Sequence, residues 1–377
     1  MGRHLFIIAG EASGDAYGAA LAAELVKQDP LVRMSGLGGP KMAAAGVDLH
    51  QDITSHAMMG FAGLIENIGG LFRAYRRTVD RLSIERPDAI VLIDFPEFNL
   101  RVARHAKRIG VPVVYYVGPQ VWAWRTGRVR KIANRVRKML VLFEFEKKLY
   151  EEAGVDVTHV GHPLLDTMAD KLGESDRSAV RRSLGLPESG TVIGLLPGSR
   201  RKEIEYIYPV LLESAGILQR KLEDVTFVTA RADKIEPALL EKVAAKHGGE
   251  PKVVAGRTHD VMLASDLLLI ASGTATLEAG LLGTPMVVTY QGPLLSYIIF
   301  GMLLCPGHLA LANIVAEKPV VPELYMINAR PEKIAAAALE ILRDGGDAMR
   351  RELGVIREKL GRPGASARAA EEILKII

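Results

Sequence analysis

The chain has little of several things that mark particular functional classes. It holds a single cysteine among its 377 residues, Cys305, which excludes a disulfide framework and a thiolate zinc cluster and predicts a reducing compartment. Its longest apolar run, 294–305, is interrupted by Ser296 and Gly301 and is too short to span a bilayer. We therefore expect any membrane contact to be peripheral.

Charge and composition narrow the class further. Lys and Arg exceed Asp and Glu by 48 to 44, but they are spread along the chain and no aromatic-basic RNA-binding signature appears, so we expect no nucleic-acid partner. An anionic membrane surface or a phosphorylated substrate suits this charge equally well. Residues 4–9 enter an apolar strand almost at once, so we expect no signal peptide and a cytoplasmic location.

Apolar runs of strand length alternate with helix-period segments, which predicts an α/β protein with two doubly wound, Rossmann-like parallel sheets facing a central cleft. We expect a first domain over 1–168, a second over 169–349 and a C-terminal helix, about 350–377, that packs back on the first. The polar segment 170–190 is the expected hinge. The expected strands are 4–9, 33–37, 88–94, 111–117, 138–143, 157–160, 191–196, 225–230, 251–255, 267–270 and 285–290.

The segment 269–278 carries the most specific signal. An apolar strand runs into a Ser-Gly-Thr turn and a helix, so free backbone N–H groups at the helix start would form a phosphate seat. Glu278, one turn on, would accept the hydroxyls of a ribose attached to that phosphate. The seat comprises Ser272, Gly273, Thr274, Ala275 and Thr276.

A second strand and tight turn, 195–200, repeats this arrangement. Gly198 and Ser199 form the turn, and the planar guanidinium of Arg200 suits phosphate oxygens. Two such turns in one half of the chain predict a bound nucleotide diphosphate. Paired carboxylates and an Asp-x-Asp element are absent from the sequence, so we expect no tightly held metal and no cofactor.

In the first half, polar residues follow two expected strands. Gly10, Ser13, Gly14 and Asp15 lie in a turn that is either a substrate-binding loop or simply a tight turn in which Ser13 or Asp15 caps the following helix; it lacks the Lys of a Walker A motif. Asp94 ends an apolar strand, where loss of hydration favours a general base. The alternative reading makes Asp94 or Asn99 the cap of a helix over 99–109, and Glu97 is the reserve candidate for the base.

Two further segments suggest a lipid ligand. Both tryptophans fall in 121–125 beside several arginines, as in the wall of an amphipathic or phosphorylated ligand's site. Large apolar residues recur at helical spacing from 58 to 72 and are followed by arginines; such a stripe is typical of a core face, or of a flap at an anionic membrane. The stripe comprises Met58, Phe61, Ile65, Ile68 and Phe72.

Six motifs, in order and over nearly the whole chain, resemble those of the lipid-A-disaccharide synthase family. They are Gly-Glu-Ala-Ser-Gly-Asp at 10–15, Asp-x-Pro-x-Phe-Asn at 94–99, Val-Trp-Ala-Trp-Arg at 121–125, Gly-His-Pro at 161–163, Leu-Pro-Gly-Ser-Arg at 196–200 and Ser-Gly-Thr-Ala-Thr-Leu-Glu at 272–278. Two departures are Phe95 and Glu97, where the family often has Ala and Asp. The Pro-Asn of the family is matched here by Ala312-Asn313.

The resemblance implies a GT-B glycosyltransferase that joins UDP-2,3-diacylglucosamine to 2,3-diacylglucosamine 1-phosphate, called lipid X, with inversion. It implies that Asp94 is the base, that Asn313 joins the nucleotide site, and that the stripe and residues 294–304 rest on the cytoplasmic face of the inner membrane of a Gram-negative-type bacterium. Implied acceptor-site residues are Gly10, Ser13, Gly14, Asp15, Asn99, Trp122 and Arg125.

Another UDP-sugar enzyme of the same fold, such as a 2-epimerase or the muramyl-pathway transferase, stays open, as does a non-catalytic nucleotide sensor at a membrane. His162, His259 and His308 show no ligand spacing, and we expect no catalytic role for His162.

Overall fold

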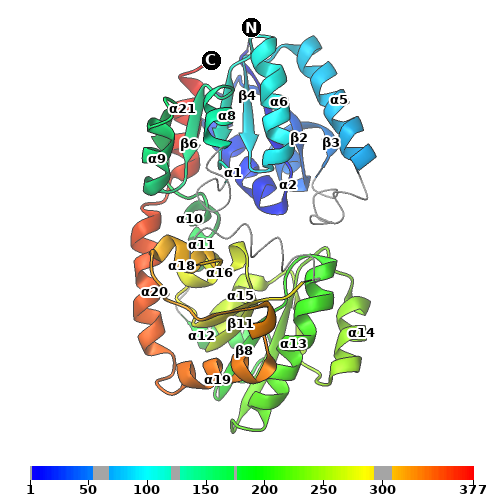
Figure 1. The fold of residues 1–377 in the computed structure, drawn as a ribbon, viewed down its shortest axis with the longest axis vertical. Coiled ribbons are helices and arrows are strands. Elements are labelled where there is room, and N and C mark those ends of the chain that lie inside the picture. The colour runs from blue at the N-terminus through cyan, green and yellow to red at the C-terminus, as the bar shows by residue number, and fades with distance from the viewer. Residues whose placement is uncertain (1, 54–67, 120–127, 174–175, 293–307) are drawn as a thin grey trace. The chain divides into compact units, whose positions relative to one another are not determined.

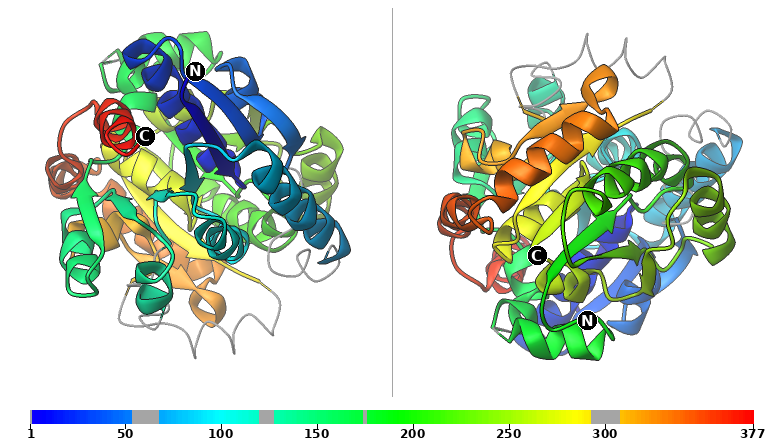
Figure 2. Two further views of the ribbon diagram at one scale, coloured as in Figure 1. Left: turned by 90° about the horizontal axis from the view of Figure 1, so that it is seen from above. Right: turned by 90° about the horizontal axis from the view of Figure 1, so that it is seen from below.

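The computed structural model describes residues 2–53, 68–119, 128–173, 176–292 and 308–377. It divides into two compact units. Unit 1 comprises Met1–Ala169 and Leu360–Ile377, and unit 2 comprises Asp170–Lys359. In each unit a parallel sheet carries helices on both faces (Figures 1 and 2).

Unit 1 is built on a seven-stranded sheet in the order β3-β2-β1-β4-β5-β6-β7. Its strands are β1 His4–Ala9, β2 Arg33–Gly38, β3 Asp48–Asp52, β4 Ala89–Ile93, β5 Val113–Tyr116, β6 Lys138–Val141 and β7 Asp156–His159. Its described helices are α1 Ala12–Gln28, α2 Pro40–Ala44, α5 Ile68–Glu85, α6 Pro96–Arg108, α8 Arg128–Ala133, α9 Glu144–Glu151, α10 Leu164–Thr167 and α21 Ala365–Leu374. Helix α11, Ala169–Leu172, carries the chain into unit 2.

Unit 2 is built on a six-stranded sheet in the order β10-β9-β8-β11-β12-β13. Its strands are β8 Thr191–Leu196, β9 Val225–Arg231, β10 Lys252–Ala255, β11 Leu267–Ala271, β12 Met286–Tyr290 and β13 Glu323–Tyr325. Its described helices are α12 Arg177–Ser183, α13 Arg201–Gln219, α14 Pro237–His247, α15 Thr258–Ala264, α16 Thr274–Leu281, α18 Leu311–Ala316, α19 Pro331–Leu342 and α20 Asp347–Leu360.

The continuous apolar runs of the sequence form the central strands of the two sheets. Every residue of β4 and of β11 is buried, because helices cover both faces of each parallel sheet. All the expected strands are present within a few residues, and two more exist. Strand β3 is polar and β13 has only three residues, and both lie at sheet edges, where a strand pairs on one side only.

The expected hinge at 170–190 begins where the two units divide, but it is not a free linker throughout. Helix α12 within it is fastened to unit 2, because Arg177 and Arg181 both form ion pairs with Asp266 at 2.8 and 2.7 Å. The Arg181 guanidinium also donates to the carbonyl of Ala264. Helix α12 is therefore an integral part of unit 2.

The end of the chain divides between the units. Leu353 and Ile356 of α20 lie beside Gly280 of unit 2, whereas α21 packs against α1 in unit 1. The Asp166 carboxylate accepts the N–H groups of Gly364 and Ser366, and the Arg368 guanidinium donates to the carbonyl of Val160. Polar contacts thus fix the last helix to the first unit.

The Gly-His-Pro motif builds this same region. Gly161 has a φ of 82°, and a Cβ there would lie 2.9 Å from the Arg368 guanidinium. His162 is buried between the rings of Tyr17 and Phe143, and its Nδ1 accepts the N–H of Leu164 at 3.1 Å. Burial lowers the pKa of His162 from 6.5 to about 3, so the ring is neutral and structural.

We expect His162→Asn to make unit 1 less sensitive to acid. Because the folded pKa lies below the unfolded value, wild-type His162 favours folding above pH 6.5, and this contribution is lost as the pH falls from 6.5 toward 3. The Asn oxygen can still accept the Leu164 N–H but does not titrate. Denaturant unfolding from pH 7 to 5 should give a shallower loss of stability in the variant, by up to about 1.4 kcal/mol per pH unit. Identical slopes for both proteins would contradict the assignment.

Candidate active site

In unit 1 the candidate residues follow two adjacent strands. β1 pairs with β4, with Ala9 opposite Ile93, and the chain leaves these two strands in opposite directions across the sheet. This is the switch point at which ligands of doubly wound sheets bind, outside the carboxyl ends of the strands. The turn at 10–15 and Asp94 therefore lie side by side.

Asp94 sits in a strained turn. Asp94 and Phe95 have φ values of 50° and 47°, the left-handed region that non-glycine residues adopt only where surrounding contacts enforce it. Those contacts are visible: Asn99 Nδ2 donates to the carbonyls of Ile93 and Asp94 at 3.2 and 2.6 Å, and the Tyr115 hydroxyl donates to the Asp94 carbonyl at 2.8 Å. Strain held in this way is frequent at functional sites.

The expected cap role of Asn99 is wrong. Helix α6 begins at Pro96, so Asn99 lies inside its first turn, fully buried, with its amide turned toward the Asp94 backbone. Asn99 therefore acts on the site by shaping the Asp94 turn. Tyr115, which sequence reasoning missed, does the same from the neighbouring strand, and only the tertiary fold brings it there.

Contacts within unit 1 also determine the shape of the turn that follows β1. A Cβ on Gly10 would lie 2.4 Å from the Phe95 ring, so glycine is required for the two turns to meet. Ser13 and Gly14 lie in the first turn of α1. Asp15 does not cap α1, as one sequence reading expected; it is buried and accepts the N–H groups of Gly39, Lys41 and Met42, which caps α2.

In unit 2 the switch point lies between β8 and β11, with Leu196 opposite Ile270. The amides of Thr274 and Ala275, at the start of α16, donate to no acceptor within the described parts of the chain, and a Cβ on Gly273 would meet nothing within 4 Å there. These N–H groups point to an anion seat. The Ser272 hydroxyl donates to the carbonyl of Leu309, distant in sequence, and the Thr276 hydroxyl donates to the carbonyl of Gly273.

Glu278 lies on α16 with one carboxylate oxygen held. His259, on α15, meets Glu278 with 3.1 Å between Nε2 and Oε2. Oε1 has no hydrogen-bond partner among the described residues, so one acceptor oxygen is left for a ligand there. Sequence reasoning left His259 without a role, because nothing in the spacing relates it to Glu278.

The second turn, after β8, differs from the expectation. Glu203 occupies the N-terminus of α13: its Oε2 accepts the N–H groups of Ser199 and Arg200 at 2.8 and 3.2 Å. These amides are therefore not available to a phosphate, which corrects the reading of 198–200 as a backbone phosphate seat. Gly198, with a φ of 115°, is required because a Cβ there would collide with Glu203.

The side chain of Arg200 is still a candidate to bind phosphate oxygens. The guanidinium lies 3.2 Å from Glu203 Oε1 and is 39% exposed. Tyr290, at the end of β12, lies in the field of this pair: burial raises its pKa, Glu203 raises it further and Arg200 lowers it. Glu203 thus fixes the direction of a cation at the edge of the site.

Asn313 is not free to bind a nucleotide. Its Oδ1 accepts the N–H groups of Val320 and Val321, and its Nδ2 donates to the carbonyl of Val321 and to Glu323. Glu323, which sequence reasoning missed, also accepts N–H groups of Leu309 and Ala310 and the hydroxyl of Tyr325. The two side chains hold the segment at 309–310 against Ser272.

Several expected site residues lie outside the described residues: Met58, Phe61, Ile65, Trp122 and Arg125. Ile68 begins α5, and Phe72 on that helix is 57% exposed, so Phe72 belongs to the surface and not to a core face. Glu97 is exposed in the first turn of α6. Among the residues that the structure describes, no helix is long and apolar enough to cross a membrane.

Comparison with known proteins identifies related chains. The family model described as lipid-A-disaccharide synthetase matches residues 5–376. A lipid-A-disaccharide synthase of Syntrophus aciditrophicus is 43% identical over 99% of this chain and 97% of its own length. One from Geobacter metallireducens is 41% identical over 100% and 97%.

Solved structures share the fold at low identity. A UDP-GlcNAc 2-epimerase from Neisseria meningitidis bound to UDP-GlcNAc aligns over 99% of this chain and 100% of its own, with a TM-score of 0.64 and 13% identity. MurG of Acinetobacter baumannii aligns over 99% of both chains, with a TM-score of 0.56 and 13% identity. These likenesses show the GT-B fold.

We expect Asn313→Ala to destabilise unit 2 by roughly 1–3 kcal/mol, because it leaves the buried N–H of Val321 without its acceptor and the N–H of Val320 with only the Lys318 carbonyl. Denaturant unfolding would measure the loss. Asn328→Ala is the matched control: Asn328 is exposed and contacts Lys333, so it should change stability by less than about 0.5 kcal/mol. Wild-type stability in Asn313→Ala would return this residue to a ligand-binding role.

Proposed function

Because the chain belongs to the lipid-A-disaccharide synthase family, as the match over residues 5–376 shows, we propose that it condenses UDP-2,3-diacylglucosamine with lipid X. It is a glycosyltransferase of lipid A biosynthesis. The products are UDP and the β-1,6-linked tetraacyl disaccharide 1-phosphate. The UDP-sugar enzymes that share the fold at 13% identity remain structural neighbours, and 41–43% identity over the full chain separates this protein from them.

Asp94 is the proposed general base. Its carboxylate takes the proton of the acceptor's 6-hydroxyl while that oxygen attacks the anomeric carbon from the face opposite UDP. The new O–C bond forms as the bond from carbon to the diphosphate oxygen breaks, and the α-linked donor gives a β-linked product. The observation that carries this role is the strained turn, in which Asn99 and Tyr115 donate to the Asp94 carbonyl and so fix the backbone that carries the side chain.

Unit 2 would hold the donor. The free amides at the start of α16 and the Arg200 side chain stabilise negative charge as it grows on the leaving diphosphate. Glu278 accepts the ribose hydroxyls. In this proposal the helix N-terminus and a fixed arginine supply the positive charge, and the reaction uses no metal ion or cofactor.

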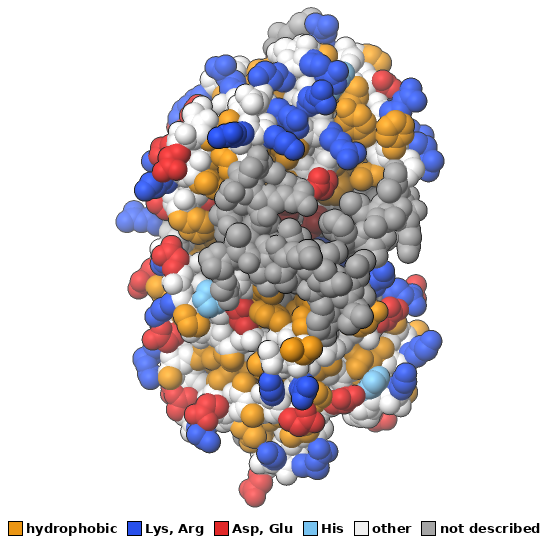
Figure 3. Space-filling view, viewed as in Figure 1, with side chains coloured by type: hydrophobic (Ala, Val, Ile, Leu, Met, Phe, Trp, Pro, Cys, Tyr) orange, Lys and Arg blue, Asp and Glu red, His pale blue; other side chains and the backbone are white. Residues whose placement is uncertain are grey.

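We further propose that unit 1 rests on the cytoplasmic face of the inner membrane through α5 and α6. The two helices pack together, with the rings of Tyr75 and Phe98 6.3 Å apart, and between them they carry eight Lys and Arg against three Asp and Glu. Figure 3 shows basic side chains gathered over these helices with apolar groups among them. Phe72 and Ile84, both on α5, are large apolar residues whose side chains are 57% and 79% exposed.

Asp94→Asn should lower turnover by about 100-fold or more, since the amide cannot accept the proton, while UDP binding changes little. Asn tolerates a left-handed φ, so the turn should survive. Steady-state kinetics and calorimetry with UDP would measure both. Glu97→Gln, the control at the reserve position, should stay within a few-fold of wild type; an active Asp94→Asn beside an inactive Glu97→Gln would move the base to Glu97.

Replacing the exposed Arg73, Arg76 and Arg77 by Gln should weaken binding to phosphatidylglycerol vesicles by about 100-fold, at about 1 kcal/mol for each basic residue near an anionic surface. Vesicle sedimentation would measure this, and the effect should vanish with phosphatidylcholine. The matched control replaces three exposed arginines of unit 2, Arg220, Arg343 and Arg351. Equal losses for both triple variants would show that net charge, and not this face, governs binding.

A further inference from the structure

We infer that His259 is a positioning residue for the donor nucleotide: it fixes the Glu278 carboxylate so that the remaining oxygen meets the ribose hydroxyls. This inference rests on the proposed function, in which Glu278 binds ribose. It starts from the contact of 3.1 Å between His259 Nε2 and Glu278 Oε2. The Glu278 side chain is 21% exposed, and the imidazole is 33% exposed.

The two oxygens of the Glu278 carboxylate have different surroundings. Oε2 accepts the ring N–H, and Oε1 has no hydrogen-bond partner in the described part of the chain. A glutamate side chain has several rotamers of similar energy, and holding one of them costs conformational entropy. When the protein already holds that rotamer before the nucleotide binds, binding does not have to supply this entropy cost, and the affinity is higher.

His259 is itself held in place, which a positioning role requires. On one side of it, Arg257 donates to the Ser183 backbone carbonyl at 2.9 Å and to the Ser183 hydroxyl at 2.7 Å. On the other side, Asp260 is buried and paired with Arg257 and with Lys171, each at 2.6 Å. Polar contacts therefore anchor the backbone at Arg257 and Asp260, on either side of the residue that contacts the Glu278 carboxylate.

A comparison of two ligands tests this directly. UDP and 2′,3′-dideoxy-UDP differ only in the ribose hydroxyls, so the ratio of their Kd values, measured by calorimetry, reports the ribose contact alone. We expect a ratio of about 10 to 100 for the wild type, since hydrogen bonds to a charged group are at stake. His259→Ala should reduce this ratio by about 3- to 10-fold, the effect of one side chain left unfixed.

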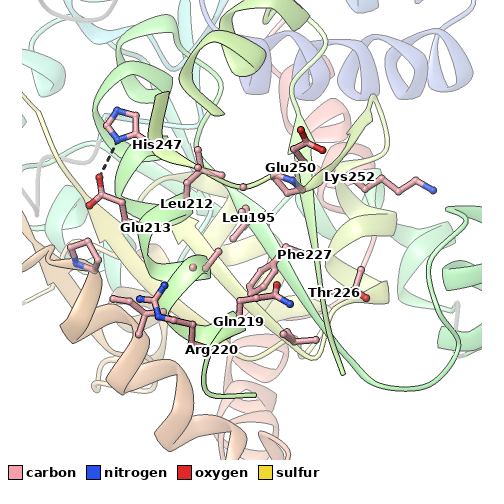
Figure 4. Close-up of a pocket in the computed structure, with 18 of the residues that line it drawn as sticks. Leu195, Leu212, Glu213, Gln219, Arg220, Thr226, Phe227, His247, Glu250 and Lys252 are labelled. Atoms are coloured by element: carbon pink, nitrogen blue, oxygen red, sulfur yellow. Dashed lines mark hydrogen bonds and ion pairs between the residues drawn. The ribbon is translucent and has the colours of Figure 1, made fainter. Parts of the chain in front are cut away.

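The variants separate positioning from general damage. His259→Gln retains an N–H donor and should restore most of the ratio. His247→Ala is the matched control, because His247 forms an equivalent pair with Glu213, 3.0 Å apart, at a cavity of about 760 Å³ whose lining includes none of the candidate site residues (Figure 4). It should leave the ratio unchanged. In the enzyme assay His259→Ala should raise KM for the UDP-sugar and leave kcat nearly unchanged.

The outcomes distinguish this inference from the proposed function. If Glu278→Ala keeps the wild-type ratio, the ribose contact itself is wrong. If Glu278→Ala brings the ratio near one while His259→Ala preserves it, Glu278 binds ribose and only the positioning role of His259 is overturned. Equal weakening of both ligands by His259→Ala, with the ratio unchanged, would reduce this residue to a general structural role and also overturn the inference.

Discussion

The positions of the candidate site residues depend on the parallel pairing of two strands in each unit, β1 with β4 and β8 with β11. Parallel strands bring their carboxyl ends to one edge, and the chain leaves each pair in opposite directions, so the two following loops lie together beyond that edge. The pairing is enforced by burial on both faces of the sheets. It brings Asp94 beside the turn at 10–15, and the turn containing Arg200 beside the start of α16.

Many polar residues near these edges build the loops and do not face a ligand. Asp15 caps α2, Asn99 grips the Asp94 turn, Glu203 closes the start of α13, and Asn313 with Glu323 holds the segment beside Ser272. Each satisfies backbone N–H or C=O groups, and where such a group is buried, leaving it unpaired costs about 1–3 kcal/mol. The proposed chemistry is therefore left to fewer groups, namely Asp94, Arg200, Glu278 and the free amides of α16.

The two units differ in what surrounds their sites. Unit 1 carries a basic face on α5 and α6 with exposed apolar residues, which suits an acylated acceptor delivered from an anionic bilayer. In unit 2, hydrogen bonds from Arg257 to Ser183 and from Arg181 to Ala264 join α12 to the segment that carries His259, which contacts Glu278, and this polar setting suits a nucleotide. In the proposed function one strand plan thus serves an acylated acceptor and the nucleotide part of an acylated donor, because the loops and outer helices carry the difference.

The sequence by itself determined the two parallel sheets, since fully buried strands read as continuous apolar runs; the polar edge strand β3 and the three-residue edge strand β13 left no such signal. The sequence also determined which turns carry the functional motifs and to which family the chain belongs, because glycines and acids at fixed spacing are local features. It did not reveal which residues of each motif face outward. Asp15 and Asn313 look like ligand-binding residues and are occupied internally, while Tyr115, Glu203, His259 and Glu323 gained their roles from neighbours distant in sequence or hidden within a helix turn. Only the tertiary structure decided this, because a hydrogen bond joins side chains by position in space, and one sequence does not record which of its polar groups meet.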